Sequence, residues 1–100
     1  MLKQPAVYIL ASKYNGTLYI GVTSNLSQRM YQHRQEAIEG FSKKYGIKML
    51  VYFEMCGDMV SAISREKALK GITRAKKIAL VESINPNWED LVIKLQLLKP

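Results

Sequence analysis

Five side chains of the kinds that can hydrolyse a phosphodiester lie in order along this chain. They are two tyrosines, an arginine, a histidine and a glutamate: Tyr8, Tyr19, Arg29, His33 and Glu66. A tyrosine can take a proton from water, an arginine can neutralise a phosphate, and a glutamate can hold a divalent metal ion. Each residue alone is ordinary, but the ordered set in a basic chain of 100 residues indicates phosphodiester chemistry.

The charge of the chain favours a polyanionic partner. Fifteen Lys and Arg residues face eight Asp and Glu residues, giving a net charge of +7. In a single small domain this excess is typical of nucleic-acid binding, and the alternative is a basic surface that serves only solubility. The lone cysteine, Cys56, is expected to be a buried thiol in a protein of the reducing cytoplasm. No apolar run is long enough to cross a membrane, so no membrane partner is expected.

The elements that must position these residues can be placed from patterns and turn signals. Alternation of apolar residues predicts strands over 6–12, 18–22 and 48–55, and Asn15-Gly16 predicts a tight hairpin turn between the first two. Helices are expected over about 25–39, 59–72, 74–83 and 88–98, with a basic loop over 41–47. Ser24 or Asn25, Asp58 and Thr73 are the expected N-caps, and Gly40 and Pro86 are helix-ending residues. The pattern predicts one α+β domain: a small three-stranded antiparallel sheet flanked by helices, in the order strand-strand-helix-strand-helix-helix, with a further helix at the C-terminal end.

Glu66 projects from an apolar helix face. That face is formed by Met59, Ala62, Ile63, Leu69 and Thr73 at helical spacing. A carboxylate aimed at a core is costly unless it is paired, protonated or bound to a cation. The alternative to a metal ligand is a glutamate that reaches solvent or pairs with Arg29 or Lys70.

His33 and Arg29 repeat this pattern on the first helix. His33 shares a face with Leu26, Met30 and Ala37, and Arg29 lies one turn earlier at the edge of that face. A lone histidine there is commonly a satisfied core residue, but an arginine stays charged and presents a planar fork suited to phosphate oxygens. Three polar residues on two apolar faces indicate a functional site, because such sites are where local rules tend to be broken.

The two tyrosines are expected to lie near each other on the hairpin. Side chains alternate between faces along a strand, and Tyr8 and Tyr19 lie on the paired strands. The alternative to a site is an ordinary cross-strand aromatic pair. Gly21 weakens the second strand and therefore marks a bulge or the close approach of a ligand.

Two basic clusters are candidate surfaces for a phosphate backbone. The first holds Arg65, Lys67, Lys70, Arg74, Lys76 and Lys77, and the second holds Lys43, Lys44 and Lys48 around Tyr45. Beside the site they would make binding dependent on salt, and the alternative is a solvated helix face. No base-reading motif is visible, so at most weak sequence preference is expected.

In these residues the chain resembles the GIY-YIG nuclease family, in its small single-domain bacterial branch. The resemblance covers nearly the whole chain and rests on these matches: Ala6-Val7-Tyr8, Tyr19-Ile20-Gly21, Arg29, His33, Lys43-Lys44-Tyr45-Gly46, Leu50-Val51-Tyr52-Phe53-Glu54, Glu66 and Asn85. Two departures stand out. Ala6-Val7 replaces the Gly-Ile of the first motif, and Val22-Thr23 stands where many members carry a lysine.

The resemblance implies hydrolysis of DNA phosphodiesters with one Mg²⁺ or Mn²⁺ ion, in a role that could belong to DNA repair or recombination. It gives Tyr8 the role of general base with Tyr19 as its partner, although the reverse assignment is open. Arg29 would stabilise the phosphoryl oxygens, His33 would orient the site or relay protons, and Glu66 would bind the metal. The expected substrate-binding residues are Gly21, Lys43, Lys44, Lys70, Arg74 and Asn85, and the alternative role for Asn85 is to hold the site in place.

Two other functions compete with a nuclease. The first is a nucleic-acid-binding module of the same fold that does not cut, which the altered first motif favours. The second is an interaction protein that self-associates weakly through its C-terminal helix, where Trp88, Leu91, Val92, Leu95 and Leu98 share a stripe. Packing of that stripe on its own domain is the alternative to self-association.

Overall fold

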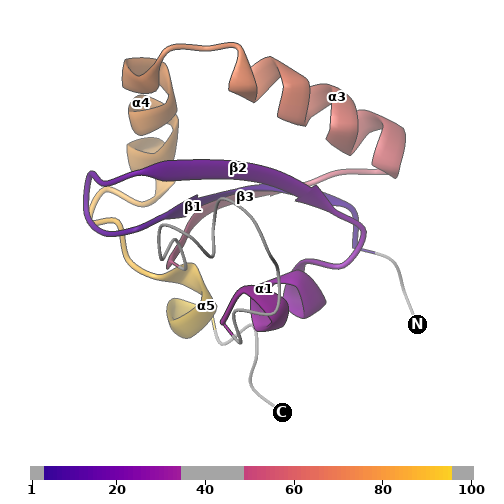
Figure 1. Ribbon diagram of the computed structural model, residues 1–100, viewed down its shortest axis with the longest axis horizontal. Coiled ribbons are helices and arrows are strands. Elements are labelled where there is room, and N and C mark those ends of the chain that lie inside the picture. Colours follow the sequence, from indigo (N-terminus) through magenta and orange to yellow (C-terminus); the bar gives the residue numbers. More distant parts are fainter. Residues whose placement is uncertain (1–3, 35–48, 96–100) are drawn as a thin grey trace.

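The fold is a three-stranded antiparallel sheet with helices on both faces. The computed structural model describes residues 4–34 and 49–95 (Figure 1). The strands are β1 (Ala6–Ala11), β2 (Leu18–Thr23) and β3 (Met49–Met55), in the sheet order β2-β1-β3. Both pairings are antiparallel, so the predicted α+β class and sheet are confirmed.

The β1–β2 hairpin turns where its sequence predicts. Asn15 has a φ of 54°, which an asparagine tolerates better than most residues. The amide of Gly16 donates to the carbonyl of Lys13 at 2.9 Å, and the amide of Ser12 donates to the carbonyl of Thr17 at 3.0 Å. The strands therefore begin to pair at Ala11 and Leu18, and Ser12 belongs to the turn instead of the predicted first strand.

The central strand β1 is completely buried and divides the core into two layers. Its even-numbered side chains pack with α1 (Leu26–Arg34) and α5 (Leu91–Lys94). Its odd-numbered side chains pack with α3 (Met59–Lys70) and α4 (Arg74–Ile84). Figure 1 shows α3 and α4 on one face of the sheet and α1 and α5 on the other. Tyr8 consequently faces α1, and β2 is an edge strand of the sheet formed by residues 4–34 and 49–95.

Helices α1, α3 and α4 begin at the predicted caps. Side chains of Asn25, Asp58 and Thr73 accept hydrogen bonds from backbone amides three residues later, at 3.1, 2.8 and 3.2 Å. Helix α3 ends at Lys70, two residues earlier than predicted. The predicted end of the first helix at Gly40 and the loop over 41–47 lie outside the described residues.

The inward face of α3 differs from the predicted one. Ala62 and Leu69 are buried as expected, but Ile63 is 39% exposed. Arg65 reaches the sheet instead and bonds to Glu54 of β3. The periodicity could not reveal this, because the partner of Arg65 lies on a distant strand.

The predicted helix over 88–98 is wrong in its start, and its predicted residues 96–98 lie outside the part of the chain that the structure describes. Helix α5 begins at Leu91, capped by Asp90, and ends at Lys94. Trp88 cannot belong to it because its φ is 54°, outside the helical range. Its buried indole donates instead to Glu82 at 2.7 Å. The apolar stripe is mostly internal, since Trp88, Leu91 and Val92 belong to the core.

Two further expectations concern Cys56 and membranes. Cys56 is half-buried at the end of β3 and packs against the core, so it is more accessible than predicted. Among residues 4–34 and 49–95, no helix is both long and apolar enough to cross a membrane.

Candidate active site

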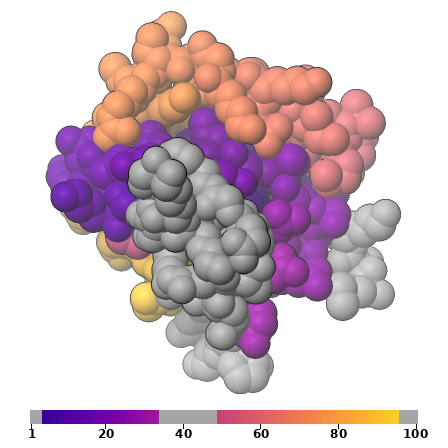
Figure 2. Space-filling model, in the orientation of Figure 1, coloured from indigo at the N-terminus to yellow at the C-terminus, as the bar shows by residue number. Residues whose placement is uncertain are grey.

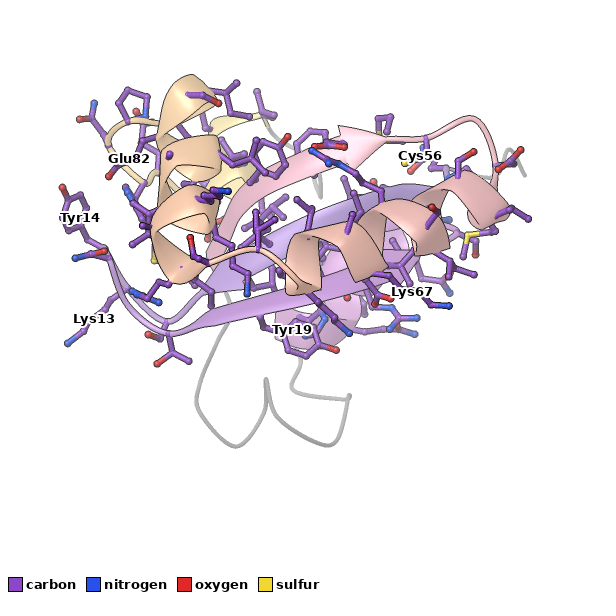
Figure 3. The ribbon with its side chains drawn as sticks, turned by 90° about the horizontal axis from the view of Figure 1, so that it is seen from above. Lys13, Tyr14, Tyr19, Cys56, Lys67 and Glu82 are labelled. Carbon is purple, nitrogen blue, oxygen red and sulfur yellow. The ribbon has the colours of Figure 1, made fainter. Side chains whose placement is uncertain are left out.

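Three aromatic rings meet beneath strand β2. The ring centres of Tyr8 and Tyr19 are 6.4 Å apart, and that of His33 lies 5.9 Å from each tyrosine. The strand register explains the tyrosine pair, because Tyr8 faces Gly21 and Leu10 faces Tyr19 across the hairpin. Both tyrosines therefore lie on the α1 face of the sheet. Figure 3 shows Tyr19 along the β2 edge, away from Lys13 and Tyr14 at the hairpin turn.

Gly21 makes room for the Tyr8 ring. A Cβ atom at this position would lie 2.5 Å from both Cζ and the hydroxyl oxygen of Tyr8. Real Cβ atoms do not approach other atoms that closely, so any larger residue would displace the ring. The sequence predicted a bulge or the close approach of a ligand at Gly21, and the group that approaches it in the structure is the Tyr8 side chain. A contact between Gly21 and substrate stays a prediction.

Tyr8 and His33 form a buried hydrogen-bonded pair. The Tyr8 hydroxyl lies 3.2 Å from Nε2 of His33, and both residues are buried. Burial, and then the neighbouring Tyr19, raise the pKa of Tyr8 well above its ordinary value. Burial, and then the positive charge of Arg29, lower the pKa of His33 to about 4. At neutral pH the site therefore holds a protonated phenol beside a neutral imidazole.

Arg29 and Glu66 bring opposite charges to the Tyr8 hydroxyl from two helices. Arg29 is half-buried on α1, and its charge and hydrogen bond lower the pKa of Tyr8. Glu66 approaches from α3, and its negative charge raises the same pKa. In the space-filling view α1 (magenta) and α3 (pink to orange) flank β2 (purple) on one side of the molecule (Figure 2). The three rings are thus in contact around Tyr8, and Arg29 and Glu66 are near enough for their charges to act on its hydroxyl.

Glu66 has the salt-bridge partner that helical spacing offered as an alternative. Nζ of Lys70 lies 3.3 Å from Oε2 of Glu66, one turn away on α3. The Glu66 side chain is 17% exposed and that of Lys70 is 55% exposed. Lys70 was expected to bind substrate, but in this structure it neutralises the carboxylate. Ion pairs at i,i+4 on helices contribute about 0.3–0.5 kcal/mol when they are exposed, and here only the lysine side is exposed.

Two predicted substrate-binding residues, Arg74 and Asn85, have hydrogen-bond partners within the protein. Arg74 donates from Nη2 to the carbonyls of Asn15 and Gly16, both at 2.8 Å, and so ties α4 to the hairpin turn. Asn85 is buried, and its amide nitrogen donates to the carbonyls of Val51 at 3.0 Å and Glu89 at 2.9 Å.

Asn85 lies at the β3 side of the sheet, and a contact between Asn85 and phosphate stays a prediction. The register of β3 against β1 shifts beside Val51, which leaves the Val51 carbonyl to pair with this side chain. Asn85 therefore holds the β3 edge of the sheet, opposite the β2 edge where the tyrosines lie. Lys43 and Lys44 lie outside the described residues.

Glu66 suits a hydrated divalent ion better than a protein-enclosed one. Within 4–34 and 49–95, no group of three or more acidic, histidine or cysteine side chains could enclose a metal. Mg²⁺ keeps much of its hydration shell and commonly uses one or two carboxylates together with substrate phosphates. A single accessible carboxylate beside the tyrosines matches that donor set.

The fold and this site place the chain among small α+β domains with a tyrosine-centred site at one sheet edge. A family model for the GIY-YIG catalytic domain matches residues 4–79, a stretch that spans both tyrosines, Arg29, His33 and Glu66. The chain belongs to the GIY-YIG family.

Within this family, the chain is similar to a group of small bacterial proteins named UPF0213. The chain is 36% identical to the UPF0213 protein of Desulfotalea psychrophila over 77% of this chain and 70% of that protein. It is 38% identical to the UPF0213 protein of Clostridium perfringens over 77% of this chain and 82% of that protein. The solution NMR structure of a UPF0213 protein from Bacillus halodurans covers 87% of this chain and 92% of its own, with 26% identity and a TM-score of 0.56.

Proposed function

We propose that this protein is a metal-dependent nuclease that hydrolyses DNA phosphodiesters at the β2 edge of its sheet. The observation that carries the proposal is the convergence of charge and hydrogen bonding on the Tyr8 hydroxyl. That atom pairs with His33 at 3.2 Å and experiences the charges of both Arg29 and Glu66. A nuclease needs a proton acceptor, a cation for the phosphate and a metal ligand, and membership of the GIY-YIG family supports these roles.

The residues of the chain account most fully for the proton-transfer step of the reaction. A free tyrosinate is scarce at neutral pH, and burial makes it scarcer at Tyr8. Tyr8 need not be ionised beforehand, because its hydroxyl can pass its own proton to Nε2 of neutral His33 as it takes a proton from water. This relay requires the histidine tautomer with its proton on Nδ1, so that the Tyr8 hydroxyl donates. Tyr19 is half-buried, and its ring centre lies 6.4 Å from that of Tyr8.

Arg29 and Glu66 would act on the phosphate itself. The Arg29 guanidinium stabilises negative charge on the phosphoryl oxygens as it develops. Glu66 would hold one Mg²⁺ or Mn²⁺ ion, which as a Lewis acid supplies stabilisation of the leaving oxygen. For Glu66 to do so, Lys70 must release it. Exposed Lys67 and Lys76 on α3 and α4 remain to contact the DNA backbone.

A non-catalytic nucleic-acid-binding module of the same fold is the second candidate. One observation favours it: Tyr8 has no exposed surface in this structure, so water reaches its hydroxyl only if neighbouring side chains move. A role in DNA repair or recombination rests on family membership alone and stays a proposal.

Cleavage with and without metal separates the two candidates. Purified protein is incubated with supercoiled plasmid and with labelled single-stranded and branched DNA, in Mg²⁺, Mn²⁺ or EDTA. The nuclease predicts strand scission in metal only, and a loss of about 10²-fold or more in Tyr8→Phe, which keeps the ring but not the hydroxyl. Binding without scission of any substrate would establish the binding module. Undiminished cleavage by Tyr8→Phe would remove Tyr8 as the base.

A further inference from the structure

A second polar cluster ties α3 to the opposite edge of the sheet. Arg65 donates to Glu54 through two parallel hydrogen bonds, Nε to Oε1 at 2.9 Å and Nη2 to Oε2 at 3.0 Å. The Tyr52 hydroxyl, two residues earlier on β3, donates to the same carboxylate. We name Tyr52, Glu54 and Arg65 the α3 clamp. None of the three belongs to the predicted catalytic set.

The clamp lies immediately beside Glu66 in the sequence. Adjacent residues of a helix point about 100° apart, so the direction of Arg65 determines the direction of Glu66. Arg65 extends toward β3, and Glu66 lies near enough to Tyr8 for its charge to raise the pKa of that tyrosine. A bidentate arginine–carboxylate pair has a fixed planar geometry, so it specifies direction as well as contact.

Apolar packing gives α3 little resistance to rotation. Of its twelve residues only Ala62 and Leu69 are buried, and one of these is small. Val60 is 78% exposed and Ile63 is 39% exposed, so neither anchors the helix in the core. The hydrogen bonds from Arg65 keep Glu54 ionised by lowering its pKa, and burial and Glu54 raise the pKa of Tyr52 to about 12. The clamp therefore persists across the neutral range.

We propose that Glu54 and Arg65, supported by Tyr52, are positioning residues that set the rotation of α3 and so aim Glu66 at the metal position. This inference rests on the proposed metal-binding role of Glu66. A carboxylate at the rim of a helix lies about 5–6 Å from its axis, so a rotation of about 15° moves it by roughly 1.5 Å. Misplacement by about 1 Å can reduce turnover on the order of 10²-fold.

The substitution that tests the clamp is Glu54→Gln, which keeps the side-chain shape but loses the charge. We expect the half-saturating Mg²⁺ concentration for cleavage to rise roughly tenfold and turnover at saturating Mg²⁺ to fall, with DNA affinity in EDTA unchanged. Reversal of the pair, Glu54→Arg with Arg65→Glu, should restore part of the loss. The matched control is Glu89→Gln, which breaks the exposed pair of Glu89 with Lys94 (3.5 Å) and should leave metal dependence unaltered.

A readout independent of activity is paramagnetic broadening of backbone amide signals by Mn²⁺. In the wild type the broadening should centre on Glu66, and in Glu54→Gln it should need a higher Mn²⁺ concentration or spread along α3. A wild type that cuts no DNA contradicts the proposed function, and the Mn²⁺ titration then decides this inference alone. If Glu54→Gln matches the wild type in Mg²⁺ and Mn²⁺ dependence and only lowers the Tm, the clamp is merely structural and the inference is overturned.

Discussion

The substitution Gly21→Ala should damage both the stability and the activity of this protein. Gly21 lies opposite Tyr8 in the β1–β2 pair, and the Tyr8 ring occupies the space above it. One added methyl group therefore acts on the candidate general base without altering any charged or hydrogen-bonding side chain. The effect can be worked out from the distances around that methyl group.

The added Cβ would lie 2.5 Å from Cζ and from the hydroxyl oxygen of Tyr8. Carbon atoms in contact normally lie about 3.5–4.0 Å apart, so the ring must move by about 1 Å. The Tyr8–His33 hydrogen bond is already 3.2 Å long, and a displacement of that size is enough to break it. Overpacking of this kind costs about 1–3 kcal/mol, and each kcal/mol lowers the Tm of such a domain by roughly 4–8 °C.

Thermal unfolding and cleavage kinetics measure the two effects. We expect the Tm of Gly21→Ala to fall by at least about 4 °C. Turnover should fall by about 10²-fold, the scale of lost acid–base catalysis. Gly57→Ala is the matched control, because a Cβ at Gly57 meets nothing within 4 Å. Its Tm and turnover should equal those of the wild type.

A double-mutant cycle with Tyr8→Leu assigns the loss to the Tyr8 ring. In the Tyr8→Leu background the clash is absent, so Gly21→Ala should then cost less than about 0.5 kcal/mol. The reasoning is refuted if Gly21→Ala is as stable and as active as Gly57→Ala. An equal loss of stability with and without the tyrosine ring would also refute it, because the strain would then lie elsewhere.

Three further predictions follow from the site and its surroundings. Arg29→Ala should lower turnover by about 10²–10³-fold with an unchanged circular dichroism spectrum, and near-wild-type turnover would remove Arg29 from the site. The His33 contribution to the free energy of unfolding should be complete above pH 6.5 and lost as the pH falls to about 4, by up to about 3 kcal/mol, because the unfolded chain binds a proton that buried His33 does not. Urea unfolding across that range measures it, and His33→Phe should flatten the curve. Asn85→Ala should cost about 1–3 kcal/mol by leaving the Val51 carbonyl unpaired, yet the folded fraction should keep full activity.

Local signals in the sequence were sufficient for most of the fold. The Asn15-Gly16 turn and the caps Asp58 and Thr73 act within a few residues, so their chemistry can be read without the rest of the chain. The same holds for alternation along the strands, which placed Tyr8 and Tyr19 on one face. The prediction of a helix at Trp88 was wrong because it rested on apolar spacing alone, which does not reveal the positive φ of this residue.

The partners of polar side chains depended on tertiary structure and could not be predicted in the same way. Asn85 matched a family motif, but its hydrogen bond to Val51 follows from a register shift that no local pattern announces. Arg74 and Arg65 were both predicted to belong to a basic surface. In the structure Arg74 binds the hairpin turn and Arg65 binds Glu54. The salt bridge between Glu66 and Lys70 was foreseeable, because its i,i+4 spacing is local.

The most direct test of the central claim compares the wild type with Glu66→Gln in one DNA-cleavage assay. This substitution keeps the size of the side chain and removes the charge that a divalent ion requires. The account predicts scission by the wild type in Mg²⁺ and none in EDTA. Glu66→Gln should fold and bind DNA normally while losing at least about 10²-fold in rate. Equal cleavage by the two proteins, or wild-type cleavage that persists in EDTA, would contradict a metal-dependent site at Glu66.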